Sequence, residues 1–451
     1  EVPANVYVMM PSCVPATYVD DNGCTLTAGK MKTYLEHPRI LGLGEVMDAA
    51  SVINGSVAMH EKLSLFQNKI RDGHAPFLSS GDLAAYALAG IATDHECVDY
   101  EYAMEECRNG MQVLIREGSA ARNLDAIVSG IVKNDTDTSG FCFCTDDKHI
   151  EDIRREGHIN YNIRRSVELG LSPERAIQIA TIQAARCYGL THLGAIAPGC
   201  QADLVVLKNL ETMEVQDVYH KGKIILKDEK TEIRPCAPEL KNTVHLKDFD
   251  KKDLRLPCIN KKAHVLQMME GQIVTKDLYE EVPFSEKQDG KDFIPDENFQ
   301  KIAVIERHKC TGKVGVGIVK GFGIQGGAIA SSVSHDSHNL IVIGDNDQDM
   351  YLAVKELVRT QGGYTLVEKG KVFDTLPLPV MGLMSDAGYE KVNDLLESMI
   401  SKAHSMGIKK GFDPFITLSF MALPVIPDIR VTPRGVYLVN EDRLLTSPFE
   451  E

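Results

Sequence analysis

Four residues that can bind a metal ion follow four short apolar runs in the first third of the chain. They are Glu45, His74, His95 and Asp146. Two imidazoles and two carboxylates form a typical nitrogen and oxygen ligand set for zinc, manganese or iron. A single histidine is more often an ordinary core or surface residue. The prediction of a metal site therefore depends on all four residues meeting at one place.

The elements around these residues can bring them together. Short apolar runs, each typical of a buried strand, alternate with amphipathic segments such as Asp82–Ala89 and Tyr100–Gly110. This repetition predicts a parallel sheet, either open or closed into a barrel. In a parallel barrel the carboxyl ends of the strands converge on one mouth. The predicted strands are Val6–Met10, Ile40–Gly44, Lys69–Asp72, Gly90–Thr93, Met111–Arg116 and Gly140–Thr145.

The composition and the hydrophobic pattern of the sequence change after this region. Ser172 and Pro173 predict a helix start, as N-cap and first helical residue, and the helix should end at Gly189. Leu193–Leu207 and Val218–Leu226 are rich in strand-forming and turn residues, as in a small sandwich. We expect a partial β/α barrel over 1–192 and half of a β-sandwich over 193–232. A connector over 233–300 should follow, with a strand at Ala263–Met268, and then a C-terminal domain over 301–451.

The C-terminal region predicts a second α/β unit. Residues 321–326 match the pattern G-x-G-x-x-G, but residues 327–333 are typical of a strand. A phosphate-binding site of this kind needs a helix N-terminus after the glycines, so we interpret the glycines as a hairpin turn. The predicted strands are Ile302–Glu306, Val314–Val319 and Leu340–Gly344, and the predicted helices are Met350–Gln361 and Glu390–His404.

Composition excludes several classes of protein. The chain has 451 residues, 43% of them hydrophobic, enough for two or three domains. Its formal net charge of -15 argues against binding to nucleic acid or an anionic membrane. No apolar run reaches the roughly 20 residues of a membrane span. The 11 scattered cysteines indicate reduced thiols and a cytoplasmic location. Cys142 and Cys144 fit two core residues of a strand better than a metal pair.

Several motifs carry a resemblance to a known family. Leu193–Leu207, preceded by Ala180–Arg186, resembles the stretch that leads from the last barrel helix into the sandwich of the amidohydrolase superfamily. Together with this stretch, six separated motifs resemble the bacterial adenine deaminases over essentially the whole chain. They are Met10–Thr17, Leu43–Asp48, Asp72–Pro76, Arg116–Ala121, Cys144–His149 and Ser334–Asn339.

The resemblance implies a fold and a cofactor. The fold is an α/β metal-dependent amidohydrolase (β/α)8 TIM-like barrel, lacking its first strands, with a small β-sandwich and a C-terminal α/β domain. The cofactor is a divalent metal, expected as a binuclear manganese or iron centre with zinc as the alternative. Glu45 would bridge the two metals, and His74 and His95 would bind one of them. Asp146 would bind the other and take the proton of the attacking water, a role that Asp147 could share.

One departure from the superfamily pattern affects the ligand set. The His-x-His pair of the first barrel strand is not found in the sequence, which begins at Glu1 close to a predicted strand. We expect that pair to precede Glu1, together with the first barrel strands and the first half of the sandwich. Without it, this chain by itself is expected to bind metal poorly.

The reaction that the resemblance implies is hydrolytic deamination of adenine to hypoxanthine and ammonia, in purine salvage or catabolism. A metal-activated hydroxide would attack C6 of the purine. Glu96 is the candidate acid for N1, with a solvated surface role as the alternative. Glu117 and Ser119 are candidates for catalysis and purine contact, with structural capping as the alternative. His335 and His338 are predicted to reach the substrate, with ordinary turn residues as the alternative.

Two other functions remain open at this stage. One is another cyclic amidohydrolase reaction, on a hydantoin or dihydropyrimidine. The other is a non-catalytic scaffold, which only the missing His-x-His pair supports and which the four candidate ligands oppose. The expected partners are adenine and water, with no nucleic acid and no membrane, in a homodimer or higher homo-oligomer.

Overall fold

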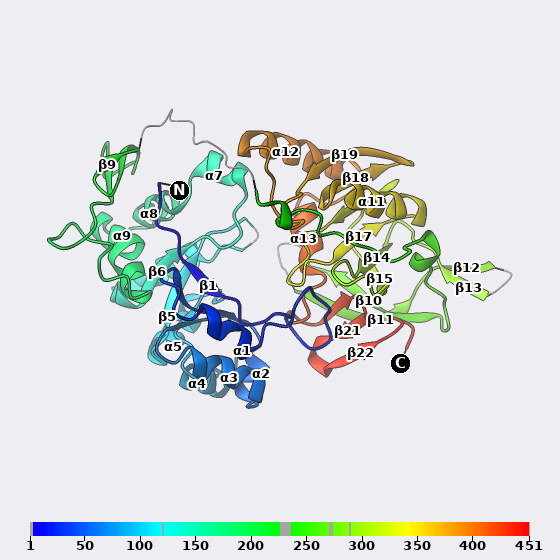
Figure 1. Ribbon diagram of the computed structural model, residues 1–451, viewed down its shortest axis with the longest axis horizontal. Helices are drawn as coiled ribbons and strands as arrows, with labels where there is room; N and C mark the ends of the chain where they lie inside the picture. The colour runs from blue at the N-terminus through cyan, green and yellow to red at the C-terminus, as the bar shows by residue number, and fades with distance from the viewer. Residues whose placement is uncertain (1–2, 120, 226–235, 270–273, 288–289, 451) are drawn as a thin grey trace. The chain divides into compact units, whose positions relative to one another are not determined.

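The chain forms two compact units. The computed structural model describes residues 3–119, 121–225, 236–269, 274–287 and 290–450 (Figure 1). Unit 1 comprises Glu1–Cys13 and Leu26–Glu232, and unit 2 comprises Val14–Thr25 and Ile233–Glu451. The segment Val14–Thr25 thus belongs with the C-terminal half of the chain, a division that the sequence pattern did not predict.

Unit 1 is built on six parallel strands. The strands form two groups of three, and within each group neighbouring strands pair in parallel. The backbone N–H of Ala92 donates to the carbonyl of Arg71 at 2.8 Å and joins the two groups. The predicted order and direction of these strands are confirmed. They are β1 (Val8–Met10), β2 (Ile40–Val46), β3 (Ile70–Gly73), β4 (Thr93–Asp94), β5 (Gln112–Arg116) and β6 (Phe141–Cys144).

Amphipathic helices alternate with these strands. In α6 (Leu124–Asn134), four apolar residues at helical spacing, Leu124, Ile127, Val128 and Ile131, are buried against the core. Burying each such side chain stabilises the fold by roughly 1.5–3 kcal/mol. The other helices are α1 (Ala28–Met31), α2 (Ala49–Ile53), α3 (Val57–Leu65), α4 (Ser80–Leu88), α5 (Tyr100–Arg108), α7 (Ile150–Glu156) and α8 (Ile159–Glu168).

The predicted helix after Ser172 is present with one irregularity. The Ser172 hydroxyl caps α9 (Pro173–Gln178) by accepting the N–H of Arg175. A π-helical turn, Ile179–Gln183, connects it to α10 (Ala184–Cys187). The helix stops before Gly189, whose φ of 67° suits a residue without Cβ.

A small antiparallel sheet follows in unit 1. It contains β7 (Leu204–Leu207), β8 (Val215–His220) and β9 (Lys223–Ile224). Residues 193–201 form turns, so the strand expected over Leu193–Leu207 occupies only its end. Residues 226–232 of the expected sandwich lie outside the described residues.

Unit 2 contains an eight-stranded sheet in the order β11-β10-β15-β14-β17-β16-β18-β19. Alternate residues of β14 (Phe299–Ile305) enter two different cores. Ile302 and Val304 join one core, and Ala303 and Ile305 join the other. The sheet is therefore buried on both faces. The remaining strands are β10 (Lys262–Met268), β11 (Thr275–Glu281), β15 (Val314–Lys320), β16 (Gly327–Ser331), β17 (Leu340–Gly344), β18 (Gly363–Glu368) and β19 (Lys371–Pro377).

Helices and short strands complete unit 2. The helix α11 (Asp347–Thr360) supplies apolar residues to the core that contains Ala303, and α12 (Tyr389–Ser405) and α13 (Pro414–Phe420) supply the core that contains Ile302. Two smaller antiparallel sheets contain β12 (Phe284–Lys287) with β13 (Gly290–Phe293), and β20 (Ile429–Thr432) with β21 (Gly435–Leu438) and β22 (Arg443–Leu445).

Two predictions for this region need correction. The expected connector over 233–300 contributes β10 and β11 to the main sheet, because alternate residues of β10 are apolar and buried. The glycine-rich segment 321–326 does precede a strand, as expected, but it is no hairpin turn. It links β15 to β16 across two intervening strands. The Asp345 carboxylate accepts the N–H groups of Gly326 and Gly327 and fixes this link.

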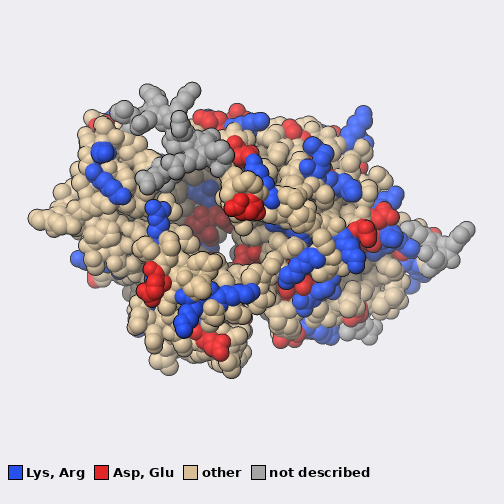
Figure 2. Space-filling model, in the orientation of Figure 1, with Lys and Arg blue, Asp and Glu red and all other residues tan. Residues whose placement is uncertain are grey.

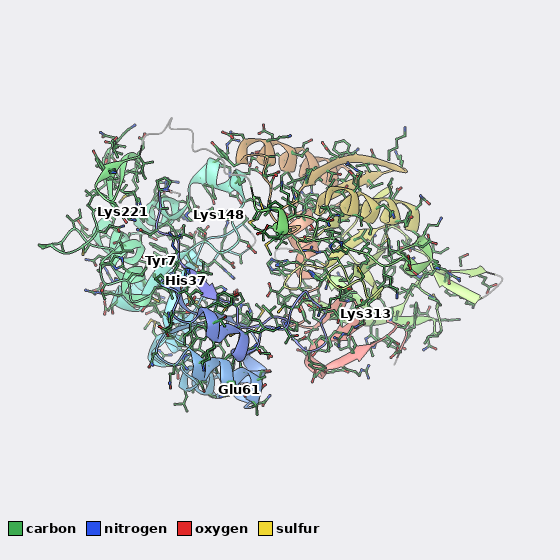
Figure 3. The ribbon with its side chains drawn as sticks, in the orientation of Figure 1. Tyr7, His37, Glu61, Lys148, Lys221 and Lys313 are labelled. Atoms are coloured by element: carbon green, nitrogen blue, oxygen red, sulfur yellow. The ribbon has the colours of Figure 1, made fainter. Side chains whose placement is uncertain are left out.

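Polar contacts hold the segment Val14–Thr25 within unit 2. The Asp20 carboxylate accepts the Ser337 hydroxyl. Asp21 forms ion pairs with Arg434 and with Lys313, which Figure 3 labels. On the visible face of unit 2, lysine and arginine side chains are interspersed with acidic ones (Figure 2). Among the described residues, no helix has the length and apolar character needed to cross a membrane.

Candidate metal centre

Three of the predicted ligands converge in unit 1. Glu45 lies on β2, His74 directly follows β3, and His95 directly follows β4. The Glu45 Oε1 atom lies 2.6 Å from His74 Nδ1 and 3.4 Å from His95 Nε2. One donor atom from each residue falls within 4.8 Å of the others. The parallel strands thus bring residues distant in sequence to one edge of the sheet.

Asp146, the fourth predicted ligand, belongs to an adjoining group. His95, Glu96 and Asp146 also have donor atoms within 4.8 Å of one another. Asp146 follows β6 and is about two-fifths exposed, whereas the Glu96 side chain is buried. His95 belongs to both groups, so the four predicted ligands and Glu96 form one continuous cluster.

Arg116 is a member of this cluster that the sequence did not identify. It ends β5, and its side chain is buried between two carboxylates. Its Nη1 lies 2.8 Å from Asp146 Oδ2 and also contacts Glu96 Oε1, while Nη2 lies 3.1 Å from Glu96 Oε2. Its position at the end of a strand, like those of the ligands, was the signal that could have revealed it.

Buried hydrogen bonds fix the backbone beneath the two histidines. The Asp94 carboxylate accepts the N–H groups of Ala75 and Glu96, both at 2.6 Å, and of Cys97 at 2.9 Å. The Tyr86 hydroxyl accepts the N–H of His74 at 3.0 Å and donates to the Val46 carbonyl. These contacts link the ends of β2, β3 and β4.

The electrostatic field of the cluster favours a cation. Burial lowers the pKa of His95, but the carboxylates of Glu45 and Glu96 outweigh it and raise that pKa well above its ordinary value. Burial raises the pKa of Glu45, but His95 and His74 outweigh it and hold that pKa well below its usual range. The carboxylates therefore create a negative potential at the imidazole nitrogens, which stabilises positive charge.

The donor set also fits a metal ion chemically. His74 Nδ1 is buried and has no hydrogen-bond partner in the described part of the chain, although the Glu45 oxygen lies close to it. Buried polar atoms are normally paired, so an unpaired imidazole nitrogen facing a carboxylate is suited to metal coordination. Two imidazoles and two carboxylates match the donor preferences of zinc, manganese and iron.

Glu117 and Ser119 occupy a neighbouring network rather than the cluster itself. Glu117 Oε1 accepts a hydrogen bond from Arg122 at 2.8 Å, and its carbonyl accepts one from Lys148, labelled in Figure 3. The Ser119 hydroxyl donates to Asp152 and accepts the N–H of His149 at the start of α7. These contacts are structural and involve no side-chain helix cap. Substrate contact by either one stays a prediction.

Asp146 and Asp147 differ in their surroundings. Asp146 faces Arg116 and the ligand cluster, and its φ of 54° places it in the left-handed region. The backbone carbonyl of Asp147 accepts the N–H of Ser119 at 2.8 Å, outside the grouped metal donors. The geometry therefore favours Asp146 over Asp147 as the ligand.

His335 and His338 lie in unit 2, whereas the metal-binding cluster lies in unit 1. The His335 ring stacks on Phe420 with centroids 4.6 Å apart. Burial lowers the pKa of His338 to about 4, and Arg307 donates a hydrogen bond to the His338 carbonyl. The two histidines are thus built into the packing of unit 2, and their contact with substrate stays a prediction.

Cys142 and Cys144 both lie on β6, Cys142 buried and Cys144 half-buried. Among the described residues, neither belongs to a group of potential metal donors. This agrees with the interpretation of both as core residues.

The comparisons with known proteins agree with this site. Residues 1–225 match the model of the amidohydrolase family, and residues 272–443 match that of the adenine deaminase C-terminal domain. An adenine deaminase of Desulfitobacterium hafniense (strain Y51) is 55% identical over 98% of this chain and 77% of its own length. One from Nitratidesulfovibrio vulgaris (strain DP4) is 42% identical over 98% of the chain and 77% of its own length.

The potential metal donors at the strand ends and the match of residues 1–225 to the amidohydrolase family together define a metal-dependent amidohydrolase. The protein belongs to the adenine deaminase family, because it is 55% identical to the Desulfitobacterium hafniense enzyme over 98% of its own length. The match of residues 272–443 to the adenine deaminase C-terminal domain agrees with this.

Proposed function

We propose that the protein hydrolyses adenine to hypoxanthine and ammonia at the cluster in unit 1. The observation that carries the proposal is the convergence of Glu45, His74, His95 and Asp146 from the ends of parallel strands. Adenine deaminase relatives aligned over nearly the whole chain support the choice of substrate. Six parallel strands with intervening helices support a (β/α)8 barrel as the complete architecture.

The four residues would hold a binuclear centre of manganese or iron, with zinc as the alternative. A divalent ion held there would supply a hydroxide nucleophile at physiological pH, by lowering the pKa of water toward neutrality. Glu45 would help to hold the metal together with both histidines, because its Oε1 approaches both imidazoles.

The residues of the chain move the protons of the reaction. Asp146, partly exposed at the edge of the cluster, accepts the proton of the attacking water and returns it to the departing amine. The overall reaction consumes one water and releases one ammonia, so the pathway leaves Asp146 ionised again.

Glu96 is the candidate acid for N1 of the purine, and it would recover that proton from the C6 hydroxyl as ammonia leaves and the C6 carbonyl forms. Both of its oxygens face Arg116, and Oε1 also lies 3.3 Å from His95 Nε2. Burial raises the pKa of Glu96, but His95, His74 and Arg116 outweigh it and hold that pKa well below its usual range. An ionised Glu96 supports a second role, in which it orients Arg116 and His95 beside the substrate. The proton donor and the orienting roles are separable, because a glutamine at position 96 retains hydrogen bonding but cannot donate an acidic proton.

A direct assay tests the proposal. The purified protein and a version extended at its N-terminus by the His-x-His segment are each loaded with manganese or iron. Conversion of adenine to hypoxanthine is followed by ultraviolet absorbance, with ammonia measured independently. We expect equal amounts of hypoxanthine and ammonia. A metal-loaded protein that leaves adenine unchanged but opens a hydantoin or dihydropyrimidine would refute the proposal and establish the other amidohydrolase reaction.

A further inference from the structure

The side chain of Arg116 connects three neighbouring strand ends of unit 1. Arg116 ends β5, Glu96 follows β4, and Asp146 follows β6. The guanidinium contacts both Glu96 oxygens and one Asp146 oxygen. A planar guanidinium can donate to two carboxylates at once, which the single ammonium of lysine cannot match in geometry.

The backbone of Arg116 is fixed as firmly as its side chain. Its N–H donates to the Asn123 side-chain oxygen at 2.7 Å, and its carbonyl accepts the Asn123 N–H at 3.0 Å. The Asn123 amide also donates to the Cys97 carbonyl at 2.8 Å. Asn123 therefore ties the end of β5 to the loop that carries His95 and Glu96.

We propose that Arg116 is a positioning residue for deamination, which holds Glu96 and Asp146 at a fixed separation on either side of the substrate. This inference rests on the proposed function. The positive charge of the buried guanidinium offsets the repulsion between the two carboxylates, which would otherwise favour their moving apart. Asp146 is partly exposed, so the contact with Arg116 restricts a side chain that water would otherwise leave free to rotate.

The expected consequence is a loss of turnover rather than of substrate binding. A displacement of about 1 Å of a reacting group costs on the order of 100-fold in rate. We therefore expect Arg116→Ala to lower kcat for adenine about 100-fold. The KM for adenine and the bound metal per chain should stay close to the wild-type values. Arg116→Lys should retain charge but recover only part of the activity, because its ammonium lacks the planar donor geometry that matches both carboxylates.

Chemical rescue separates positioning from a merely structural role. Guanidinium chloride, at a concentration too low to unfold the protein, should enter the space left in Arg116→Ala and raise kcat about tenfold, and methylammonium should do less. Arg165→Ala is the matched control. Arg165 forms a comparable bidentate pair with Asp125, but at a half-buried position on α8 away from the cluster. It should keep wild-type kcat with and without guanidinium.

Several outcomes would overturn the inference. They are wild-type kcat in Arg116→Ala, failure of guanidinium to raise its kcat, or a loss that matches a loss of bound metal. If Arg116→Ala does not fold, the test uses Arg116→Lys instead. Wild-type kcat in Arg116→Lys would refute the proposal that the guanidinium positions Glu96 and Asp146. A metal-loaded wild-type protein that is inactive on adenine would instead refute the proposed function.

Discussion

His74 Nδ1 and Glu45 Oε1 lie 2.6 Å apart, although their residues belong to successive strands of the parallel sheet. The imidazole is buried, and its Nδ1 has no hydrogen-bond partner in the described part of the chain. The backbone of His74 is held by the Tyr86 hydroxyl. The pair is thus fixed in a geometry in which both side chains present donor atoms to the same point.

Removing this imidazole should abolish both metal binding and activity. We expect His74→Ala to lower kcat for adenine by at least about 10³-fold, since bound metal contributes several kcal/mol of transition-state stabilisation. Metal per chain, measured by inductively coupled plasma mass spectrometry, should fall in parallel. His37→Ala is the control, because His37 is an exposed histidine of the same unit, labelled in Figure 3. Full metal content in His74→Ala would contradict the assignment.

Asp146 and Asp147 can be distinguished by the same substitution at each position. Asp146→Asn should lower kcat by about 10²–10⁴-fold, the usual contribution of a general acid–base group. Asp147→Asn should leave kcat within a few-fold of wild type, because Asp147 lies outside the groups of potential metal donors among the described residues. The measurement is steady-state kinetics at equal metal loading. Equal losses in both variants would show that the two carboxylates share the role.

Local patterns predicted much of unit 1. The runs that became β2 and β5 are short, apolar and bounded by helical segments, so their burial and parallel pairing followed from periodicity. The strand-end positions of the ligands followed in turn. Arg116 was missed because an arginine normally lies at the surface, and its burial depends on carboxylates from two other strands.

Two features of unit 2 were not accessible to the same reasoning. The polar residues of β11 (Thr275–Glu281) gave it the composition of a linker, although it pairs with β10 along its whole length. The contact between Asp20 and Ser337 joins residues more than 300 positions apart. Such pairings leave no periodic signal, because they depend on tertiary packing rather than on neighbouring residues.

Tyr86→Phe should weaken the centre without touching a ligand. The hydroxyl satisfies the buried N–H of His74 and the carbonyl of Val46, and its loss would leave both unpaired at a cost of about 1–3 kcal/mol. We expect a lower thermal midpoint and a metal affinity reduced about 10–100-fold, as for other groups that orient ligands. Tyr34→Phe, at an exposed position, is the control. Unchanged metal affinity in Tyr86→Phe would show that His74 is held by packing alone.

Glu106→Gln should stabilise the protein, and more so as the pH rises. Glu106 is buried, and Asp94 and Cys97 lie beside it, with one donor atom of each within 4.8 Å of its carboxylate. Burial, reinforced by the Asp94 charge, raises the pKa of Glu106 to about 10. The folded protein therefore keeps a proton that the unfolded chain releases near its ordinary pKa of 4.5, so stability declines as the pH rises from about 4.5 to about 10.

The size of this effect at neutral pH follows from the unfolded state. Retaining a proton at pH 7 on a carboxyl with an ordinary pKa of 4.5 costs about 3 kcal/mol, which glutamine avoids. The measurement is the urea midpoint of unfolding at pH 5, 7 and 8.5. Wild type and Glu106→Gln should have similar midpoints at pH 5, and the midpoint of Glu106→Gln should exceed that of wild type by a growing margin at pH 7 and 8.5. Glu101→Gln, exposed on the same helix, should show no such trend. A variant less stable than wild type at pH 8.5 would mean that Glu106 is ionised and stabilised by a cation.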